Sequence, residues 1–153
     1  MQWLHTTPKK LKKKAVGGNM GEKVRFGIAG CGVIGKLHAQ QLKLVPDAEI
    51  SGFADEVGSK AENYAAEFGG KAYDSYEEML KDERVQVVSI CTPSGIHGEM
   101  AIQAARYGKH VVVEKPIDVS LAVADRMVAA CRESGVLLSC IFFSTVSMRR
   151  PCG

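Results

Sequence analysis

Short runs of apolar residues alternate along this chain with longer segments in which apolar residues recur at helical spacing. The short runs predict strands at 24–29, 49–54, 71–73, 85–91, 110–113 and 136–142. The helical segments between them cover 33–44, 59–68, 77–80, 96–107 and 119–133. Because strands and helices alternate with short connections, we predict an α/β fold with a doubly wound, six-stranded parallel sheet and helices on both of its faces.

The two ends of the chain lack this alternation. Residues 1–20 carry a lysine cluster and no strand or helix period, so we expect a disordered basic leader. No apolar segment follows the lysines, which argues against a signal peptide. A basic arm for nucleic acid or membrane is the alternative, and Met20 is a candidate for the true start. The predicted folded domain is 21–142, and 143–153 form an aberrant tail.

The composition is that of an ordinary globular protein, with 46% hydrophobic and 24% charged residues. The net charge of +3 comes from the N-terminal lysines, so the domain offers no case for nucleic acid. The 5 cysteines are odd in number and form no C-x-x-C pair, so we predict neither a disulfide framework nor a metal site. This cysteine usage favours the cytoplasm. No apolar run reaches the roughly 18 residues of a membrane span.

Three glycines follow the first predicted strand with the spacing G-x-G-x-x-G. Gly30 permits a tight turn, Gly32 lets the backbone approach a pyrophosphate, and Gly35 lets the next helix pack against the strand. Val33 and Ile34 lie in the first helical turn, where free N–H groups and the helix dipole favour phosphate. This motif alone is weak, but together with the alternating elements it predicts a Rossmann dinucleotide-binding domain.

Asp55 stands at the end of the second predicted strand, about 20 residues after Gly35. A carboxylate there can accept both hydroxyls of the adenosine ribose and repels a 2′-phosphate. With Glu56 beside it and no arginine nearby, we predict NAD rather than NADP as the cofactor. The alternative is a solvated turn residue or a helix N-cap.

Two further clusters follow strands on the other side of the predicted switch point. Thr92, Pro93 and His97 would border the ribose and nicotinamide of the cofactor, although His97 could simply begin a helix and Pro93 form a turn. Glu114 and Lys115 follow the strand at 110–113 and precede a proline. A charge in that crevice faces the ligand, so both are candidate site residues; a strand-end ion pair is the alternative.

These motifs resemble the Gfo/Idh/MocA family of oxidoreductases. The matching stretches are 27–38 (GIAGCGVIGKLH), 89–97 (SICTPSGIH) and 108–117 (GKHVVVEKPI). The resemblance implies an NAD(P)-dependent enzyme that transfers hydride between the nicotinamide and a sugar, cyclitol or polyol. It also implies that Lys115 positions the substrate and tunes its proton transfer, which makes it the one catalytic residue we predict, while Glu114 and Pro116 shape that loop.

The chain departs from the family after residue 142. Family members continue into an α+β substrate domain that supplies a catalytic histidine and often forms homo-oligomers, so we expect that domain to be absent and this chain to be truncated and inactive alone. One permitted codon set for the tail encodes QHRFDAAA in a shifted frame, which resembles the family's domain junction. A frameshift near Phe143 is therefore our hypothesis.

Two other hypotheses stay open. The chain could be a non-catalytic nucleotide-binding or redox-sensing protein, or its catalytic half could come from another chain. A large apolar patch on the face that the second domain should cover would argue for truncation.

Overall fold

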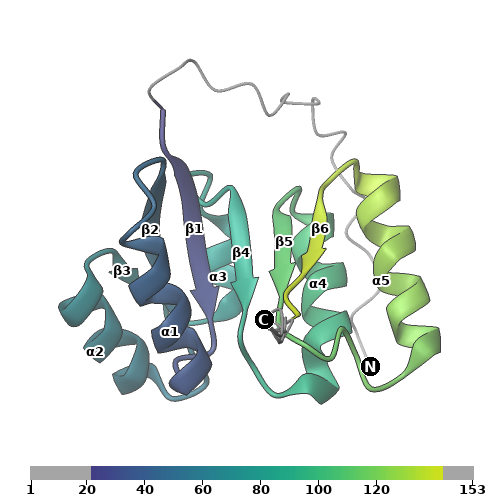
Figure 1. Cartoon of the computed structure of the whole chain (residues 1–153), viewed down its shortest axis with the longest axis horizontal. Helices are drawn as coiled ribbons and strands as arrows, with labels where there is room; N and C mark the ends of the chain where they lie inside the picture. The colour runs from purple at the N-terminus through teal and green to yellow at the C-terminus, as the bar shows by residue number, and fades with distance from the viewer. Residues whose placement is uncertain (1–21, 143–153) are drawn as a thin grey trace, which may run out of the picture.

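The computed structural model describes residues 22–142, which form one layered α/β domain (Figure 1). The strands are β1 (Val24–Ala29), β2 (Ala48–Ala54), β3 (Lys71–Ala72), β4 (Val87–Ile90), β5 (His110–Val113) and β6 (Leu138–Cys140). The helices are α1 (Val33–Leu42), α2 (Gly58–Phe68), α3 (Tyr76–Lys81), α4 (His97–Arg106) and α5 (Leu121–Ser134), with a 3₁₀ turn, η1, at Ser94–Ile96.

The six strands form one parallel sheet in the order β3-β2-β1-β4-β5-β6. The chain moves from β1 toward one edge through β2 and β3, then crosses back to β4 and continues toward the other edge. The connections therefore diverge between β1 and β4, which is where ligands bind in doubly wound sheets. Ala29 pairs with Ala54 and with Ile90, and Ile90 pairs with Val113, so four strands end level with one another.

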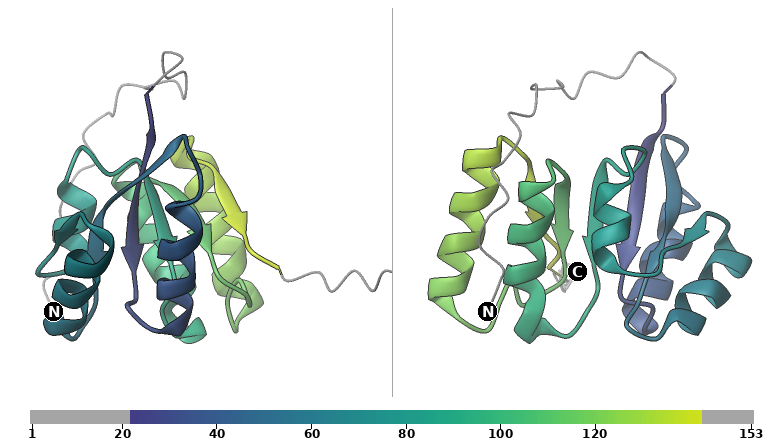
Figure 2. Two further views of the ribbon diagram at one scale, coloured as in Figure 1. Left: turned by 60° about the vertical axis from the view of Figure 1, so that its left-hand side comes forward. Right: turned by 180° about the vertical axis from the view of Figure 1, so that it is seen from behind.

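Helices cover the sheet on both faces, as right-handed crossovers require (Figure 2). Helices α1 and α2 pack on β1 and β2 through Ala39, Ala61 and Phe68 against Ile28 and Phe53. Helices α3, α4 and α5 cover the opposite face. Their buried side chains meet alternate residues of β4 and β5 in the larger core cluster, which includes Met79, Leu80, Val88, Ile90, Ala101, Ala104, Val111, Val113 and Met127.

The predicted doubly wound sheet is confirmed, with differences at the ends of elements. The predicted helix 33–44 ends at Leu42, four residues before Pro46, which cannot continue a helix. The predicted helix 96–107 is found as α4, one residue shorter at each end; Ile96, with φ −121° and ψ 3°, is the last residue of η1 and the N-cap of α4. The predicted strand 85–91 pairs as a ladder only over Val87–Ile90. Helix α3 is capped by Ser75, whose hydroxyl accepts the N–H of Glu78.

One face of the β5–β6 half is not covered by a helix among residues 22–142 (Figure 1). Strand alternation places Val112, Leu137 and Ile141 on this face. Val112 and Ile141 are half-buried, whereas Leu137 is 67% exposed. The apolar exposure on this face is thus concentrated at its edge.

The predicted basic leader, the possible start at Met20 and the tail 143–153 lie outside the described residues. None of the helices within 22–142 is long and apolar enough to cross a membrane.

Candidate functional site

The glycine loop joins β1 to α1 at the edge where the four strands end. Gly30 has φ +97°, and a β-carbon there would lie 2.7 Å from the carbonyl oxygen of Cys91, on β4's side of the crevice. A β-carbon on Gly35 would collide with the carbonyl oxygen of Gly30. A β-carbon on Gly32 would meet nothing within 4 Å. Gly30 and Gly35 are therefore required for the packing of the fold, whereas Gly32 leaves space for a ligand.

Helix α1 begins at this open position. Within the described part of the chain, no side chain caps its N-terminus, and no acidic residue lies in its first turn. Val33 is 86% exposed and Ile34 is 36% exposed. The first-turn N–H groups thus meet solvent at the positive end of the helix dipole, an arrangement that favours a bound phosphate.

Asp55 follows β2 directly and is fixed by the glycine loop itself. Its Oδ2 accepts the N–H of Cys31 over 2.7 Å, and its Oδ1 accepts the N–H of Val57 over 2.9 Å. The Asp55 side chain is 13% exposed. Because each carboxylate oxygen can accept more than one hydrogen bond, Asp55 keeps acceptor capacity for ribose hydroxyls beside the loop.

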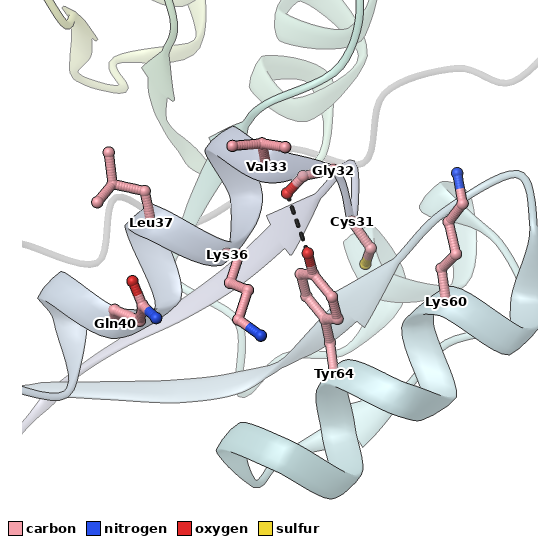
Figure 3. A pocket seen from close by; sticks show the side chains of 8 residues that line it. All are labelled: Cys31, Gly32, Val33, Lys36, Leu37, Gln40, Lys60 and Tyr64. Atoms are coloured by element: carbon pink, nitrogen blue, oxygen red, sulfur yellow. Dashed lines mark hydrogen bonds between the residues drawn. The ribbon is translucent and has the colours of Figure 1, made fainter.

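A groove of about 510 Å³ opens beside the glycine loop, between α1 and α2 (Figure 3). The Tyr64 hydroxyl donates to the carbonyl oxygen of Gly32 over 3.0 Å and forms part of its floor. Lys36 and Lys60 bring ammonium groups to the groove, where Lys36 pairs with Glu67 and Lys60 lies 4.0 Å from Oδ1 of Asp55. The full lining is Cys31, Gly32, Val33, Lys36, Leu37, Gln40, Lys60 and Tyr64.

The loop after β4 brings Thr92 and Pro93 to the same edge. Pro93 is exposed and Thr92 half-buried, with its hydroxyl 3.3 Å from the sulfur of Met100. His97 is only 1% exposed. Its ring lies behind these residues and contacts the backbone carbonyl oxygens of Thr92 and Pro116.

The end of β5 carries Glu114, which is 5% exposed, and Lys115, which is exposed and precedes a cis peptide bond to Pro116. Oε1 of Glu114 lies 2.8 Å from Nε2 of His38 on α1, and Nδ1 of His38 lies 2.7 Å from the hydroxyl of Ser89. This buried network joins α1, β4 and β5 beneath the crevice. It leaves the side chain of Lys115 at the surface.

Three residues near the site, His38, Asp118 and Lys60, are not among the site residues predicted from the sequence. The spacing of His38, three residues after Gly35, puts it on the first turns of α1 facing the sheet, and that was the available signal. Asp118 follows the Lys115–Pro116 loop, where its Oδ2 accepts the N–H of Gly98. Only the packing of the loops revealed that contact.

The two cysteines near the site are held as thiols. Burial, followed by the charge of Asp55, raises the pKa of Cys31 to about 12. Burial likewise raises the pKa of Cys91 to about 12, although its sulfur lies 3.4 Å from Nδ1 of His38. A protonated thiol is a poor nucleophile, so this cysteine–histidine contact does not favour nucleophilic catalysis. Among residues 22–142, no group of three His, Cys, Asp or Glu side chains is placed to hold a metal ion.

The geometry fits a dinucleotide. The open position at Gly32, the uncapped N-terminus of α1 and the carboxylate of Asp55 lie in sequence along one edge of the sheet. Pyrophosphate and ribose need this combination of N–H donors and a carboxylate acceptor.

Comparison with known proteins gives the same result. The model of the oxidoreductase family with an NAD-binding Rossmann fold, Gfo/Idh/MocA, matches residues 24–142. The chain is 34% identical over 116 residues to a myo-inositol 2-dehydrogenase of Thermotoga maritima, a match that covers 75% of this chain and 35% of that enzyme. It is 36% identical over 121 residues to the scyllo-inositol 2-dehydrogenase (NAD(+)) of Bacillus subtilis, covering 77% of this chain and 35% of the enzyme.

Solved structures agree with these matches. The 3-ketoreductase KijD10 from Actinomadura kijaniata, in complex with NADP, superposes with a TM-score of 0.75 at 31% identity, over 78% of this chain and 38% of that one. GenD2 from gentamicin A biosynthesis, in complex with NAD, superposes with a TM-score of 0.76 at 31% identity, over 81% of this chain and 36% of that one. The chain thus spans little more than a third of its relatives' length. It belongs to the Gfo/Idh/MocA oxidoreductase family and forms that family's nicotinamide cofactor-binding Rossmann domain.

Proposed function

We propose that this chain is the NAD-binding part of an oxidoreductase that transfers hydride between the nicotinamide and a carbinol or ketone carbon of a sugar, cyclitol or polyol. The observation that carries the proposal is the alignment of four strand ends, since the residues that follow them are Gly30, Asp55, Cys91 and Glu114. Each of the loops that begin there has a group suited to one part of a dinucleotide or its substrate.

The proposed contacts with the cofactor follow the edge of the sheet. The backbone at Gly32, Val33 and Ile34 would hold the pyrophosphate, with Gly30 and Gly35 fixing the loop. Asp55 would accept the ribose hydroxyls. Thr92 and Pro93 would border the nicotinamide, while His97 and Glu114 would act from behind the loops, because both are buried.

Lys115 is the proposed catalytic residue. It is exposed at the carboxyl end of β5, next to the crevice between β1 and β4. When bound, the nicotinamide ring supplies the hydride acceptor or donor. The Lys115 ammonium would hydrogen-bond the reacting oxygen of the substrate and stabilise the charge that develops there as its proton leaves or arrives.

NAD is the proposed cofactor, with NADP less favoured. Support comes from Asp55, whose carboxylate would repel a 2′-phosphate. The scyllo-inositol dehydrogenase is named as an NAD(+) enzyme and GenD2 was solved with NAD, whereas KijD10 was solved with NADP.

The substrate half of the active site is proposed to lie outside this chain, which would make the chain inactive alone. The matched dehydrogenases are nearly three times as long as the matched region, and they act, by name, on inositols. The free cysteines among the described residues support a cytoplasmic location. Any homo-oligomer would form through the proposed substrate domain outside this chain.

Titration of the purified chain with NADH and NADPH, followed by nucleotide fluorescence, tests the proposal. We expect saturable binding with NADH preferred, and no turnover with inositols or sugars. The matched control is Gly32→Asp, which places a carboxylate at the proposed pyrophosphate position, where a β-carbon meets nothing within 4 Å. Absence of NADH binding would refute the proposal, and binding that Gly32→Asp leaves unchanged would place the site elsewhere.

A further inference from the structure

Both ring nitrogens of His97 face backbone carbonyl oxygens. Nε2 lies 2.8 Å from the carbonyl oxygen of Thr92, and Nδ1 lies 2.9 Å from that of Pro116. The residue is 1% exposed, so water has little access to the ring. A carbonyl oxygen can only accept a hydrogen bond.

A neutral imidazole carries one N–H donor and one lone pair. In this position it would satisfy one carbonyl and bring its lone pair against the other oxygen at under 3 Å, a repulsive contact in a buried place. An imidazolium carries two N–H donors and satisfies both carbonyls. The geometry of His97 therefore matches the charged form of the ring.

A counter-charge lies beside it. Asp118 accepts the N–H of Gly98 at Oδ2 and the N–H of Ser120 at Oδ1, each over 2.9 Å. Burial alone would raise the pKa of Asp118, but the backbone N–H groups that it accepts hold it below its usual range. A β-carbon on Gly98 would lie 2.9 Å from Oδ2 of Asp118, so the carboxylate is packed against the start of α4.

We propose that His97 is an imidazolium in the folded chain, and that its two N–H groups together fix the Lys115–Pro116 loop against the loop at Thr92. His97 is then a positioning residue: it sets the distance between the border of the nicotinamide site and the candidate catalytic lysine. This second part rests on the proposed function. Asp118 reinforces the same junction by joining residues 116–120 to the N-terminus of α4.

The chain contains its own reference for the neutral form. Nδ1 of His110 accepts the N–H of Leu137 over 2.9 Å, which requires a lone pair on that nitrogen. Burial lowers the pKa of His110, which also favours the neutral ring. His97 and His110 are therefore expected in opposite protonation states at the same pH.

Imidazole nitrogen chemical shifts of the isotope-labelled full chain near pH 7 test the charge. We expect both nitrogens of His97 in the protonated range and Nδ1 of His110 in the unprotonated range. His97→Gln and His110→Gln assign the signals. An unprotonated nitrogen on His97 would overturn the proposal. This measurement needs no cofactor, so it stands even if the proposed function fails.

The positioning role is tested with two ligands that share an adenosine diphosphate. NADH reaches the nicotinamide site, whereas ADP-ribose lacks the nicotinamide. For His97→Gln, which can donate to only one of the two carbonyls at a time, we expect NADH affinity to fall about tenfold while ADP-ribose affinity stays within about twofold of wild type. Equal losses for both ligands would show a merely structural role, and unchanged NADH affinity would also overturn the positioning role. If wild type binds neither ligand, it is the proposed function that fails.

Discussion

The ammonium of Lys60 lies 4.0 Å from Oδ1 of Asp55, so the end of β2 presents a carboxylate and a cation together. The carboxylate disfavours a 2′-phosphate and the ammonium favours one. Asp55 is 13% exposed and Lys60 53% exposed, so the carboxylate is the better fixed and less screened of the two. This difference underlies the preference for NAD that we propose.

Asp55→Asn should therefore reverse the cofactor preference. An amide keeps one oxygen for the N–H of Cys31, but it loses the hydrogen bond from Val57 and removes the negative charge. We expect NADH affinity to fall about tenfold, because hydrogen bonds from ribose to a charged acceptor are lost, and NADPH affinity to rise. Fluorescence titration with both nucleotides measures the change.

The double variant Asp55→Asn/Lys60→Met is the control for that reversal. If Lys60 attracts the 2′-phosphate, the gain in NADPH affinity should disappear in the double variant. A gain that persists without the lysine would mean that Lys60 does not reach the phosphate.

Gly32 and Gly35 should respond in opposite ways to alanine. Gly32→Ala places a methyl group in open space, so the thermal midpoint should stay near wild type while NADH affinity falls by about tenfold or more. Gly35→Ala drives a methyl group into the carbonyl of Gly30, so the fold itself should lose stability. Thermal unfolding and titration of both variants separate the two effects. A large loss of stability in Gly32→Ala would contradict the role assigned to it.

The sheet and its ligand edge were predictable because parallel strands buried on both faces leave continuous apolar runs, and the residue after each run falls at one edge. Asp55 and Lys115 were found in this way. The direction in which a side chain points was not predictable where packing decides it. His97 is an example: the turn at η1 and the entry into α4 direct its ring behind the loops.

The His38–Glu114 contact could not be predicted from the sequence for a related reason. The two residues lie far apart in the chain, and their meeting depends on how α1 crosses β4 toward β5. The position of a residue within a helix can indicate which face it occupies, but it does not identify the carboxylate that lies opposite.

The His38–Glu114 pair should be important for stability, because its side chains are only 11% and 7% exposed. His38→Ala removes the partner of Oε1 and leaves the buried Glu114 carboxylate with the N–H of Lys115, and we expect a loss of roughly 3 kcal/mol in the free energy of unfolding. Glu114→Gln keeps an acceptor for the ring N–H and should cost less. Urea denaturation of the full chain measures both.

Helix α1 offers a matched control for that pair. Lys36 and Glu67 form an ion pair of 2.8 Å with side chains 43% and 47% exposed. Lys36→Ala should leave the urea midpoint almost unchanged, because solvent screens exposed pairs. If His38→Ala behaved as mildly as Lys36→Ala, the buried contact would not be a stabilising one.

Part of the loss of folding stability at acid pH should be due to Asp82. The guanidinium of Arg84 donates to its Oδ2 over 2.8 Å, and the Tyr73 hydroxyl donates to the same oxygen over 2.9 Å. The hydrogen bond from Arg84, above all, holds the pKa of Asp82 well below its usual range. As the pH falls, an aspartate in the unfolded chain takes up its proton near pH 4, whereas Asp82 in the folded chain does so only at a lower pH. The contribution of Asp82 to the stability of the fold is therefore complete above about pH 4 and is lost as the pH falls further.

Asp82→Asn should therefore be less stable than wild type at neutral pH and should lose stability less steeply below about pH 4. Glu83→Gln, at the exposed neighbouring position, should keep the steep wild-type profile because Glu83 makes neither of the hydrogen bonds that hold Asp82. Urea midpoints measured from neutral pH down into this range give the comparison. The slope of stability against pH is set by the difference in proton binding between the folded and unfolded chains. If the urea midpoints of Asp82→Asn and wild type fell in parallel as the pH is lowered, carboxyl groups other than Asp82 would be responsible for the loss of stability in acid.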